Sequence, residues 1–232
     1  AIKINPNYVE AYNNLGLALI ETNEFKKAIN CYQKAIHINP NYVEAQNNLG
    51  LAFKILKKYD ESINCYKKAI MLNPNHAPAH SNLGLLFKEL GEYQKAINCY
   101  EKAIEINPNN VNAHNNIGNL FLKSGKIEKA INCYEKAIEI NPNDSDIHNN
   151  LGNCYDESKN FKKAISCYEK AIEINPNYII AYNNLGLAFR ELNELKKAAS
   201  CYEKALNLDP SREEICEGYG DLLLKLNMHI KA

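Results

Sequence analysis

The chain has 232 residues, of which 46% are hydrophobic, so it carries ample apolar surface for a folded core. Its 27 basic and 27 acidic residues give a formal net charge of zero, which argues against nucleic acid or an anionic membrane surface as a partner, because both attract clustered positive charge. No apolar run approaches the roughly 18 residues of a membrane-spanning helix, and no signal-like segment opens the chain.

The prolines show a 34-residue period. All but one of them are spaced in this way, and only Pro78 departs from the series Pro6, Pro40, Pro74, Pro108, Pro142, Pro176 and Pro210. A fixed period between about 20 and 50 residues predicts a stacked array of repeats. We therefore number the positions within a repeat as slots, with slot 1 at Val9 in the first repeat and at Val111 in the fourth.

In chain order, residues 1–8 come first and read AIKINPNY, which matches AIEINPNY at residues 171–178. We interpret them as the tail of a preceding repeat and expect the chain to be an excerpt from a longer protein. Six full repeats follow, at residues 9–42, 43–76, 77–110, 111–144, 145–178 and 179–212. Residues 213–232 are predicted to form a partial seventh repeat or a capping helix, with a first helix over 213–226 and then the start of a second.

Each repeat is predicted to contain two amphipathic helices. In the fourth repeat, apolar residues recur at steps of three and four in the first half, from Ala113 to Phe121, and again in the second half, from Ile127 to Ile140. Gly125 fits a left-handed residue after the first helix, as Gly91 does one repeat earlier. Pro142 should end the second helix near Asn141.

Three asparagines that follow a proline, Asn7, Asn41 and Asn143, are predicted to cap the next helix. Asn7 and Asn41 precede Glu10 and Glu44 by three residues, which is a variant of the capping box. Asn143 takes the same place in the fourth repeat.

The combined pattern resembles the tetratricopeptide repeat, which has an aromatic residue at slot 4, Leu-Gly at 7 and 8, Tyr at 11, Ala at 20, an aromatic at 24, Ala at 27 and Pro at 32. The fourth repeat matches it with Ile117, Gly118, Phe121, Ala130, Tyr134, Ala137 and Pro142. Departures are Ser62 at slot 20 and Gln46, His80, His114 and His148 at slot 4. The resemblance implies an all-α, right-handed superhelix of antiparallel helix pairs, which needs about three repeats to close its core.

Cysteine and histidine repeat with the array and do not converge on a point. Equivalent residues of successive repeats lie more than about 8–10 Å apart, whereas a disulfide needs Cα atoms within about 7 Å. We therefore expect reduced, packed thiols at Cys31, Cys65, Cys99, Cys133, Cys167 and Cys201, and we assign no role to Cys154 and Cys216. The sequence has no spacing of Cys or His that is typical of a zinc site, and no arrangement of Ser, His and Asp that is typical of catalysis. We therefore predict that the segment is not an enzyme and binds no metal or cofactor.

Asparagine is enriched on one side of the first helices, although it is a mediocre helix former. It fills slot 6 at Asn14, Asn48, Asn82, Asn116, Asn150 and Asn184, slot 5 at Asn13, Asn47, Asn115, Asn149 and Asn183, and slot 9 at Asn119 and Asn153. Ser81 is the exception at slot 5. In tetratricopeptide superhelices these slots line the concave groove, so the resemblance implies an asparagine ladder along it.

The ladder has two interpretations. A carboxamide offers donors and an acceptor that complement a peptide main chain and ignore its side chains, which predicts weak, sequence-tolerant binding of extended polypeptide in the groove. Alternatively, the amides of slots 5 and 6 bond within the scaffold and tie neighbouring first helices together.

Similar ladders occur in the arrays of O-GlcNAc transferases and plant-type O-fucosyltransferases. This resemblance implies a module that recruits polypeptide substrate for an attached enzyme, in the cytoplasm, the nucleus or both. The alternative is an assembly scaffold, as in cell-cycle ligase subunits, that binds partner helices or forms homodimers. A chaperone adaptor that grips a terminal carboxylate is disfavoured, because slots 2, 5 and 6 hold no Lys or Arg.

Overall fold

The computed structural model describes residues 5–230, and the side chains as far as Leu226. Over this range the chain forms thirteen α-helices, which confirms the predicted all-α class. They are α1 (Val9–Glu21), α2 (Phe25–Ile38), α3 (Val43–Ile55), α4 (Tyr59–Leu72), α5 (Ala77–Glu89), α6 (Tyr93–Ile106), α7 (Val111–Lys123), α8 (Ile127–Ile140), α9 (Ser145–Glu157), α10 (Phe161–Ile174), α11 (Ile179–Glu191), α12 (Leu195–Leu208) and α13 (Glu213–Ile230).

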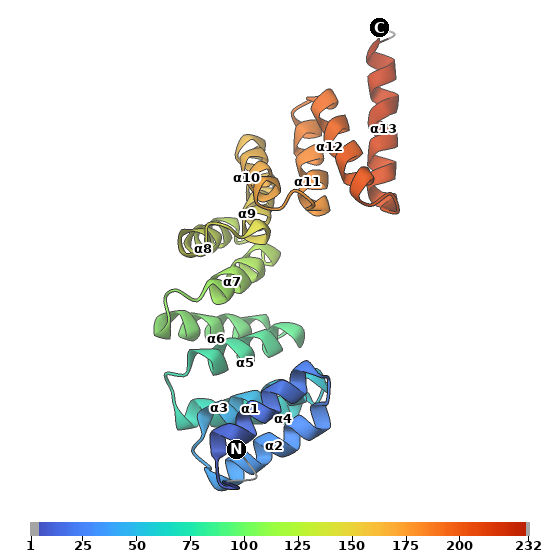
Figure 1. Ribbon diagram of the computed structural model, residues 1–232. Coiled ribbons are helices and arrows are strands. Elements are labelled where there is room, and N and C mark those ends of the chain that lie inside the picture. Colours follow the sequence, from blue (N-terminus) through green and yellow to red (C-terminus); the bar gives the residue numbers. More distant parts are fainter. Residues whose placement is uncertain (1–4, 231–232) are drawn as a thin grey trace. The chain divides into compact units, whose positions relative to one another are not determined.

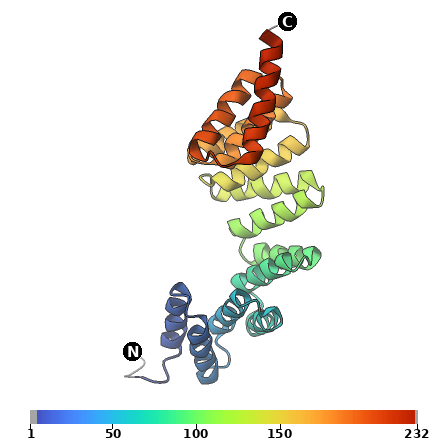
Figure 2. The same ribbon diagram turned by 90° about the vertical axis from the view of Figure 1, so that its right-hand side faces the viewer.

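The helices belong to two compact units, residues 1–113 and 114–232. In the first unit, the pairs α1 and α2, α3 and α4, and α5 and α6 pack together, and α2 and α4 also contact α3 and α5, the first helices that follow them (Figures 1 and 2). The second unit repeats this order, from α8 on α9 to α12 on α13. None of the helices between residues 5 and 230 has the length and apolar character that crossing a membrane requires.

The tight turn inside each pair depends on one left-handed residue at slot 15. Gly91 and Gly125 have φ angles of 77° and 71°, as their glycines predict. Asn and Lys take the same conformation in the other four pairs, at Asn23, Lys57, Lys159 and Asn193. Asparagine tolerates this region well, whereas lysine adopts it against its intrinsic preference. The turn is therefore imposed by the packing of the two helices and not by glycine alone.

The predicted caps at Asn7, Asn41 and Asn143 are wrong, because each helix begins one residue later and the polar bond in the turn is made by the asparagine before the proline. In every such turn that asparagine accepts a hydrogen bond through Oδ1 from the backbone N–H two residues later, as Asn39 does from Asn41 at 3.0 Å. This Asx turn places the helix start one residue further on. The cap residues are thus Tyr8 and Tyr42, whose side chains make no cap bond, and Asp144, which accepts from two backbone N–H groups.

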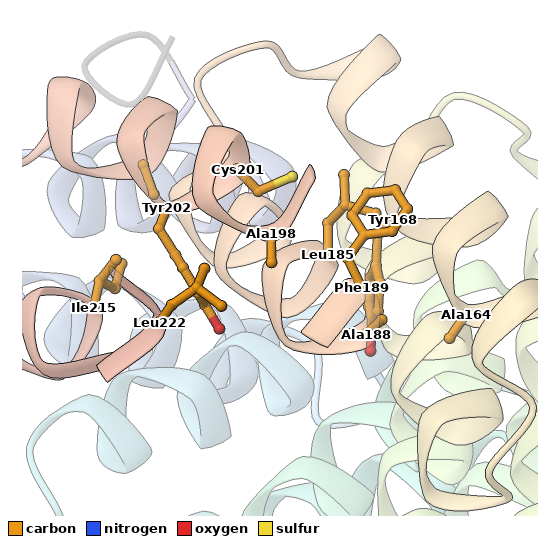
Figure 3. Packing of buried hydrophobic residues seen from close by; sticks show 11 residues of the cluster. Ala164, Tyr168, Leu185, Ala188, Phe189, Ala198, Cys201, Tyr202, Ile215 and Leu222 are labelled. Atoms are coloured by element: carbon orange, nitrogen blue, oxygen red, sulfur yellow. The ribbon is translucent and has the colours of Figure 1, made fainter. Parts of the chain in front are cut away.

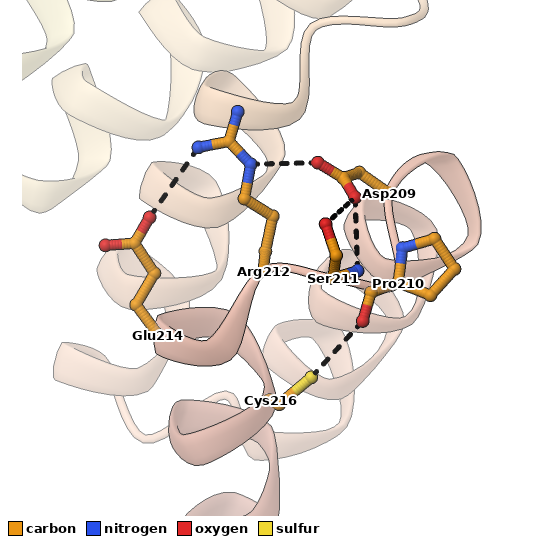
Figure 4. A network of polar contacts seen from close by, with 6 residues as sticks. All are labelled: Asp209, Pro210, Ser211, Arg212, Glu214 and Cys216. Atoms are coloured by element: carbon orange, nitrogen blue, oxygen red, sulfur yellow. Dashed lines mark hydrogen bonds and ion pairs between the residues drawn. The ribbon is translucent and has the colours of Figure 1, made fainter.

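The last of these turns uses an aspartate (Figure 4). Asp209 accepts from the backbone N–H of Ser211 at 3.1 Å, from the Ser211 hydroxyl at 2.6 Å and from Arg212 Nε at 3.1 Å. The bonds from Ser211 lower the pKa of the Asp209 carboxyl, and those of Arg212 add to the effect. The turn before α13 therefore keeps the geometry of the earlier ones with a charged acceptor.

Within each pair, a glycine at slot 8 lies against a tyrosine at slot 24. A Cβ atom placed on Gly152 would come within 2.5 Å of Tyr168 Cε1, and one on Gly16 within 2.4 Å of Tyr32 Cε1. The six tyrosines of this set, Tyr32, Tyr66, Tyr100, Tyr134, Tyr168 and Tyr202, are all buried. Figure 3 shows two of them within the apolar cluster of α10 to α13.

The departure at slot 20 also has a structural reason. Ser62 is fully buried where the other repeats have alanine, and its hydroxyl donates to the carbonyl oxygen of Gly50 at 2.7 Å. A buried hydroxyl with a partner is tolerated, since its desolvation is compensated.

The end of the chain differs from the prediction. The first helix of the seventh repeat was expected to end at Leu226, but α13 continues without a break to Ile230. Slot 15 holds Asn227, the residue type that takes the left-handed conformation at Asn23 and Asn193, but the helix runs through it. Residues 213–230 therefore form one helix, which packs on α12.

We predict that Gly152→Ala lowers the free energy of unfolding by about 1–3 kcal/mol, because the new methyl group overlaps the ring of Tyr168. Gly220→Ala is the matched control. It occupies slot 8 of α13, where nothing lies within 4 Å of a Cβ, so alanine there should be neutral or stabilising by up to about 1 kcal/mol. Urea denaturation followed by circular dichroism measures both, and equal effects would contradict the contact as the cause.

Candidate functional site

The candidate site is the surface formed by slots 5, 6, 9, 12 and 13 of the first helices, which we call the first-helix face. In the first unit it belongs to α1, α3 and α5, and in the second to α7, α9 and α11. The first helices touch their successors directly, α1 with α3, α3 with α5 and α9 with α11. Their side chains at these slots therefore meet between repeats.

The asparagines of slots 5 and 6 bond to one another across repeats. The slot-6 amide donates through Nδ2 to the slot-5 Oδ1 of the preceding repeat. The distances are 2.9 Å from Asn48 to Asn13, 3.0 Å from Asn82 to Asn47, 3.2 Å from Asn150 to Asn115 and 3.0 Å from Asn184 to Asn149. The bond runs in the same direction each time, from the later repeat to the earlier one.

Burial separates the two slots. At slot 5, Asn13, Asn47 and Asn149 are buried, while Asn115 and Asn183 are half-buried. At slot 6, Asn14 is exposed, and Asn48, Asn82, Asn116, Asn150 and Asn184 are half-buried. The slot-5 side chains thus lie beneath the surface and accept the ladder bonds. The slot-6 side chains lie at the surface, and the ladder bond uses only one of their N–H donors.

The sequence departs from the asparagine pattern at two places. Ser81 replaces asparagine at slot 5, and its hydroxyl accepts from Asn110 Nδ2 at 3.0 Å. After Asn183, slot 6 of the next helix is Gly218, which has no amide to donate.

The slot-9 asparagines accept hydrogen bonds from buried tyrosines of the core. The hydroxyl of Tyr134 donates to Asn119 Oδ1 at 2.8 Å, and that of Tyr168 donates to Asn153 Oδ1 at 2.9 Å. Asn153 Oδ1 also accepts from Asn184 Nδ2 at 3.1 Å. Where slot 9 is leucine, the tyrosine hydroxyl is buried without a partner in the described part of the chain, at Tyr32, Tyr66, Tyr100 and Tyr202. Sequence reasoning placed Asn119 and Asn153 in the groove but missed this bond.

Charge on the face differs between the units. In the first, Lys54 Nζ and Glu89 Oε1 form an ion pair at 2.9 Å between slots 12 and 13 of neighbouring repeats. In the second, the corresponding slots hold Asp156 and Glu191. Burial raises the pKa of the Asp156 carboxyl, and Glu157 and Glu191 raise it further against the opposing effect of Lys159.

A pocket of about 250 Å³ opens on the face of the second unit. It is lined by Leu122, Asn153, Asp156, Glu157, Tyr168, Asn184 and Leu187. These residues come from slots 6, 9, 12, 13 and 24, so most of the lining belongs to the slots that sequence reasoning assigned to the groove.

The slot-4 histidines hold the turns. His80 Nε2 lies 3.0 Å from the carbonyl oxygen of Pro74, and His148 Nε2 lies 2.9 Å from that of Pro142. These bonds join the first helix to the turn before it, which explains how a polar ring replaces the usual aromatic residue.

None of the described cysteines forms a disulfide, and all of them are buried or half-buried except Cys216, which is exposed. Burial raises the pKa of Cys65, Cys99, Cys167 and Cys201 to about 11, and that of Cys154 to about 12, so little thiolate forms at neutral pH. Among the described residues, no three His, Cys, Asp or Glu side chains are grouped so as to hold a metal ion.

We predict that Tyr134→Phe lowers the free energy of unfolding by about 0.5–1.5 kcal/mol, because the bond to Asn119 is lost. Tyr202→Phe, in the same unit, removes a hydroxyl that has no partner, so it should be neutral or stabilising. Urea denaturation of the two variants gives the comparison. A larger loss in Tyr202→Phe than in Tyr134→Phe would contradict the assigned bond.

Among solved structures, MamA is 27% identical with a TM-score of 0.67, over 72% of this chain and 97% of that one. YrrB, described as a TPR protein with an unusual peptide-binding site, is 25% identical with a TM-score of 0.62, over 78% and 93%. PilF of Pseudomonas aeruginosa is 20% identical with a TM-score of 0.81, over 92% and 97%, and shares the fold. No curated protein matches the chain significantly.

Three family models match the chain, and all describe the repeat. One, described as TPR repeat, matches residues 16–56, 84–125 and 118–158. Two further models are described as tetratricopeptide repeat. The first matches residues 43–76, 145–178 and 179–212, and the second matches residues 1–30 and 65–98. Together these matches cover more than half of the chain, with the glycine, alanine, tyrosine and proline slots described above. The chain belongs to the tetratricopeptide repeat family.

Proposed function

We propose that the chain is a protein–protein interaction module whose first-helix face binds the main chain of extended polypeptide. The slot-6 asparagines make the contacts, and the slot-5 asparagines hold them in place. The observation that carries the proposal is the one-way amide ladder, in which a buried slot-5 oxygen fixes a slot-6 amide that remains at the surface.

The chemistry of the slot-6 amide suits a main chain. A carboxamide has two N–H donors and an oxygen that accepts two bonds, and the ladder uses one donor. Asn82, for example, keeps its Oδ1 and its second N–H for a ligand after donating to Asn47. These are the groups that pair with the N–H and C=O of a peptide unit. Both interpretations of the asparagines therefore hold at once, since the scaffold bond orients the binding group.

The spacing of the amides matches an extended chain. Packed helices lie about 8–10 Å apart, and an extended chain rises about 3.3 Å per residue. Each repeat therefore spans about three residues of ligand and offers one slot-6 amide to them.

Amide bonds alone do not give high affinity. Each contributes about 0.5–1.5 kcal/mol, whereas ordering three residues costs about 3–6 kcal/mol. The ladder therefore sets the register and direction of the ligand, and side-chain contacts must supply further binding free energy. The peptide-binding site in the printed description of YrrB supports this use of the fold.

The array resembles those of O-GlcNAc and O-fucose transferases in its slot-6 asparagines. We extend the proposal to the same role, in which the module recruits polypeptide for an attached enzyme. Fusing the array to a glycosyltransferase domain and assaying transfer to a bound polypeptide tests this extension.

A second candidate function is an assembly scaffold that self-associates. It is favoured by the exposed leucines of α13, where Leu224 is 65% and Leu223 is 41% exposed. Light scattering at increasing concentration tests it, and a monomer at about 100 μM would contradict it, since a specific interface gives a Kd well below that.

We predict that Asn48→Ala, Asn82→Ala and Asn150→Ala combined weaken polypeptide binding about tenfold or more, because three main-chain contacts are lost. The measurement is fluorescence anisotropy with labelled, reduced and carboxymethylated α-lactalbumin, which is unfolded and offers side chains of all types. The matched control changes three exposed asparagines of the second helices, Asn30, Asn64 and Asn132, to alanine, and should bind as the wild type does.

The single variant Asn14→Ala separates binding from stability. Asn14 is exposed and takes no part in the ladder, so its loss should weaken binding by about twofold to tenfold without changing the melting temperature. Unchanged binding in both the triple variant and Asn14→Ala, with helicity intact, would overturn the proposed contacts.

A further inference from the structure

The pocket on the second unit's face has walls of two kinds. Leu122 and Leu187 supply apolar surface, and Asp156 and Glu157 supply carboxylates. The amides of Asn153 and Asn184 lie between them, and Asn184 is a slot-6 residue of the ladder. A side chain that enters here from a polypeptide held on the ladder meets methyl groups along its stem and negative charge at its end.

The carboxylates at this pocket are not engaged in the ion pairs that the structure shows within the second unit. Those ion pairs join Lys136 to Glu139, Lys170 to Glu173, Lys197 to Glu194, and Arg212 to Asp209 and Glu214. Lys159 lowers the pKa of the Asp156 carboxyl, against the effects of burial, Glu157 and Glu191, and its Nζ lies 5.8 Å from the ring centroid of Phe161. Surface carboxylates gathered without a cation repel one another and are stabilised by a positive ligand.

In the first unit, the side chains at the same slots form an ion pair with each other. There Lys54 at slot 12 pairs with Glu89 at slot 13 of the next repeat, at 2.9 Å. In the second unit slot 12 is Asp156 and slot 13 of the next repeat is Glu191, so an attractive pair is replaced by a repulsive one. The scaffold thus lacks a positive charge at the place where it has one in the first unit.

We infer that this pocket binds a lysine or arginine side chain of the polypeptide that the ladder holds. The inference rests on the proposed function and adds to it a preference for basic residues at one position of the ligand. The methylene stem of the ligand packs between Leu122 and Leu187, while the cationic head reaches Asp156 and Glu157 and takes the charge role that Lys54 has in the first unit.

The test compares three acetylated and amidated peptides of alternating glycine and serine, labelled with a fluorophore. Their central residue is lysine, arginine or norleucine, the last of which keeps the apolar stem without charge. Anisotropy titration of the full chain should give about tenfold tighter binding of the lysine or arginine peptide than of the norleucine peptide. The preference should shrink as salt rises from 20 to about 500 mM, because the pocket is open to solvent.

The double variant Asp156→Asn and Glu157→Gln should remove the preference for a basic residue while leaving the norleucine peptide bound as before. Its melting temperature should equal or exceed that of the wild type, because repulsion is relieved. Glu89→Gln, in the first unit, is the matched control and should keep the preference.

The outcomes separate the two proposals. Equal binding of all three peptides, or a preference that survives in the double variant, overturns the basic pocket and leaves main-chain binding intact. Binding of the basic peptides that is unchanged by the combined Asn48→Ala, Asn82→Ala and Asn150→Ala substitutions supports the pocket and contradicts the main-chain mode. Binding of none overturns both.

Discussion

The contact between the slot-8 glycine and the slot-24 tyrosine is the constraint on which the repeat depends. Each phenol ring occupies the volume that a Cβ would need, as the 2.5 Å approach at Gly152 and Tyr168 shows. The first and second helices can therefore approach closely only where one has no side chain and the other has a flat, large one. Because the pair is fixed in this way, the opposite side of the first helix has a defined orientation toward its neighbours.

The first-helix face derives its order from that packing. Neighbouring first helices come close enough for a carboxamide on one to donate to a carboxamide on the previous one. Asn153 links the core to the first-helix face, since its side-chain oxygen accepts one bond from the buried hydroxyl of Tyr168 and another from Asn184 on the face. The surface amide is thus held by bonds that begin in the core, which is the preorganisation that a binding group needs.

Much of the fold could be predicted from the sequence, because the 34-residue period repeats each signal. Helix ends at Pro142 and left-handed turns at Gly91 and Gly125 are local consequences of one residue type. The caps could not be assigned as easily, since asparagine stands on both sides of six of the prolines. Only geometry shows that Asn39 accepts the bond in the turn and that Tyr42 is the cap residue of α3. The unbroken course of α13 was missed because the repeat was extended past its last clear match.

The candidate asparagines could be found because they recur from repeat to repeat, but the different roles of slots 5 and 6 could not be predicted. Asn13 and Asn14 are adjacent and chemically identical. Only their burial shows that the first belongs to the buried row of slot 5 and the second to the surface row of slot 6. An offset of 35 residues between donor and acceptor, as from Asn48 to Asn13, was a signal that the sequence held. The pocket was not predictable, because it depends on the depth left between side chains of four helices, α7, α9, α10 and α11.

The uniform direction of the ladder makes those repeats interchangeable in which slots 5 and 6 are both asparagine. Such a repeat presents an acceptor to its successor and a donor to its predecessor, so it can be gained or lost by recombination without leaving a mismatched junction beside another of the same kind. Such a surface can lengthen by duplication while every existing bond keeps its partner. Gly218, which offers no donor, ends the series at Asn183.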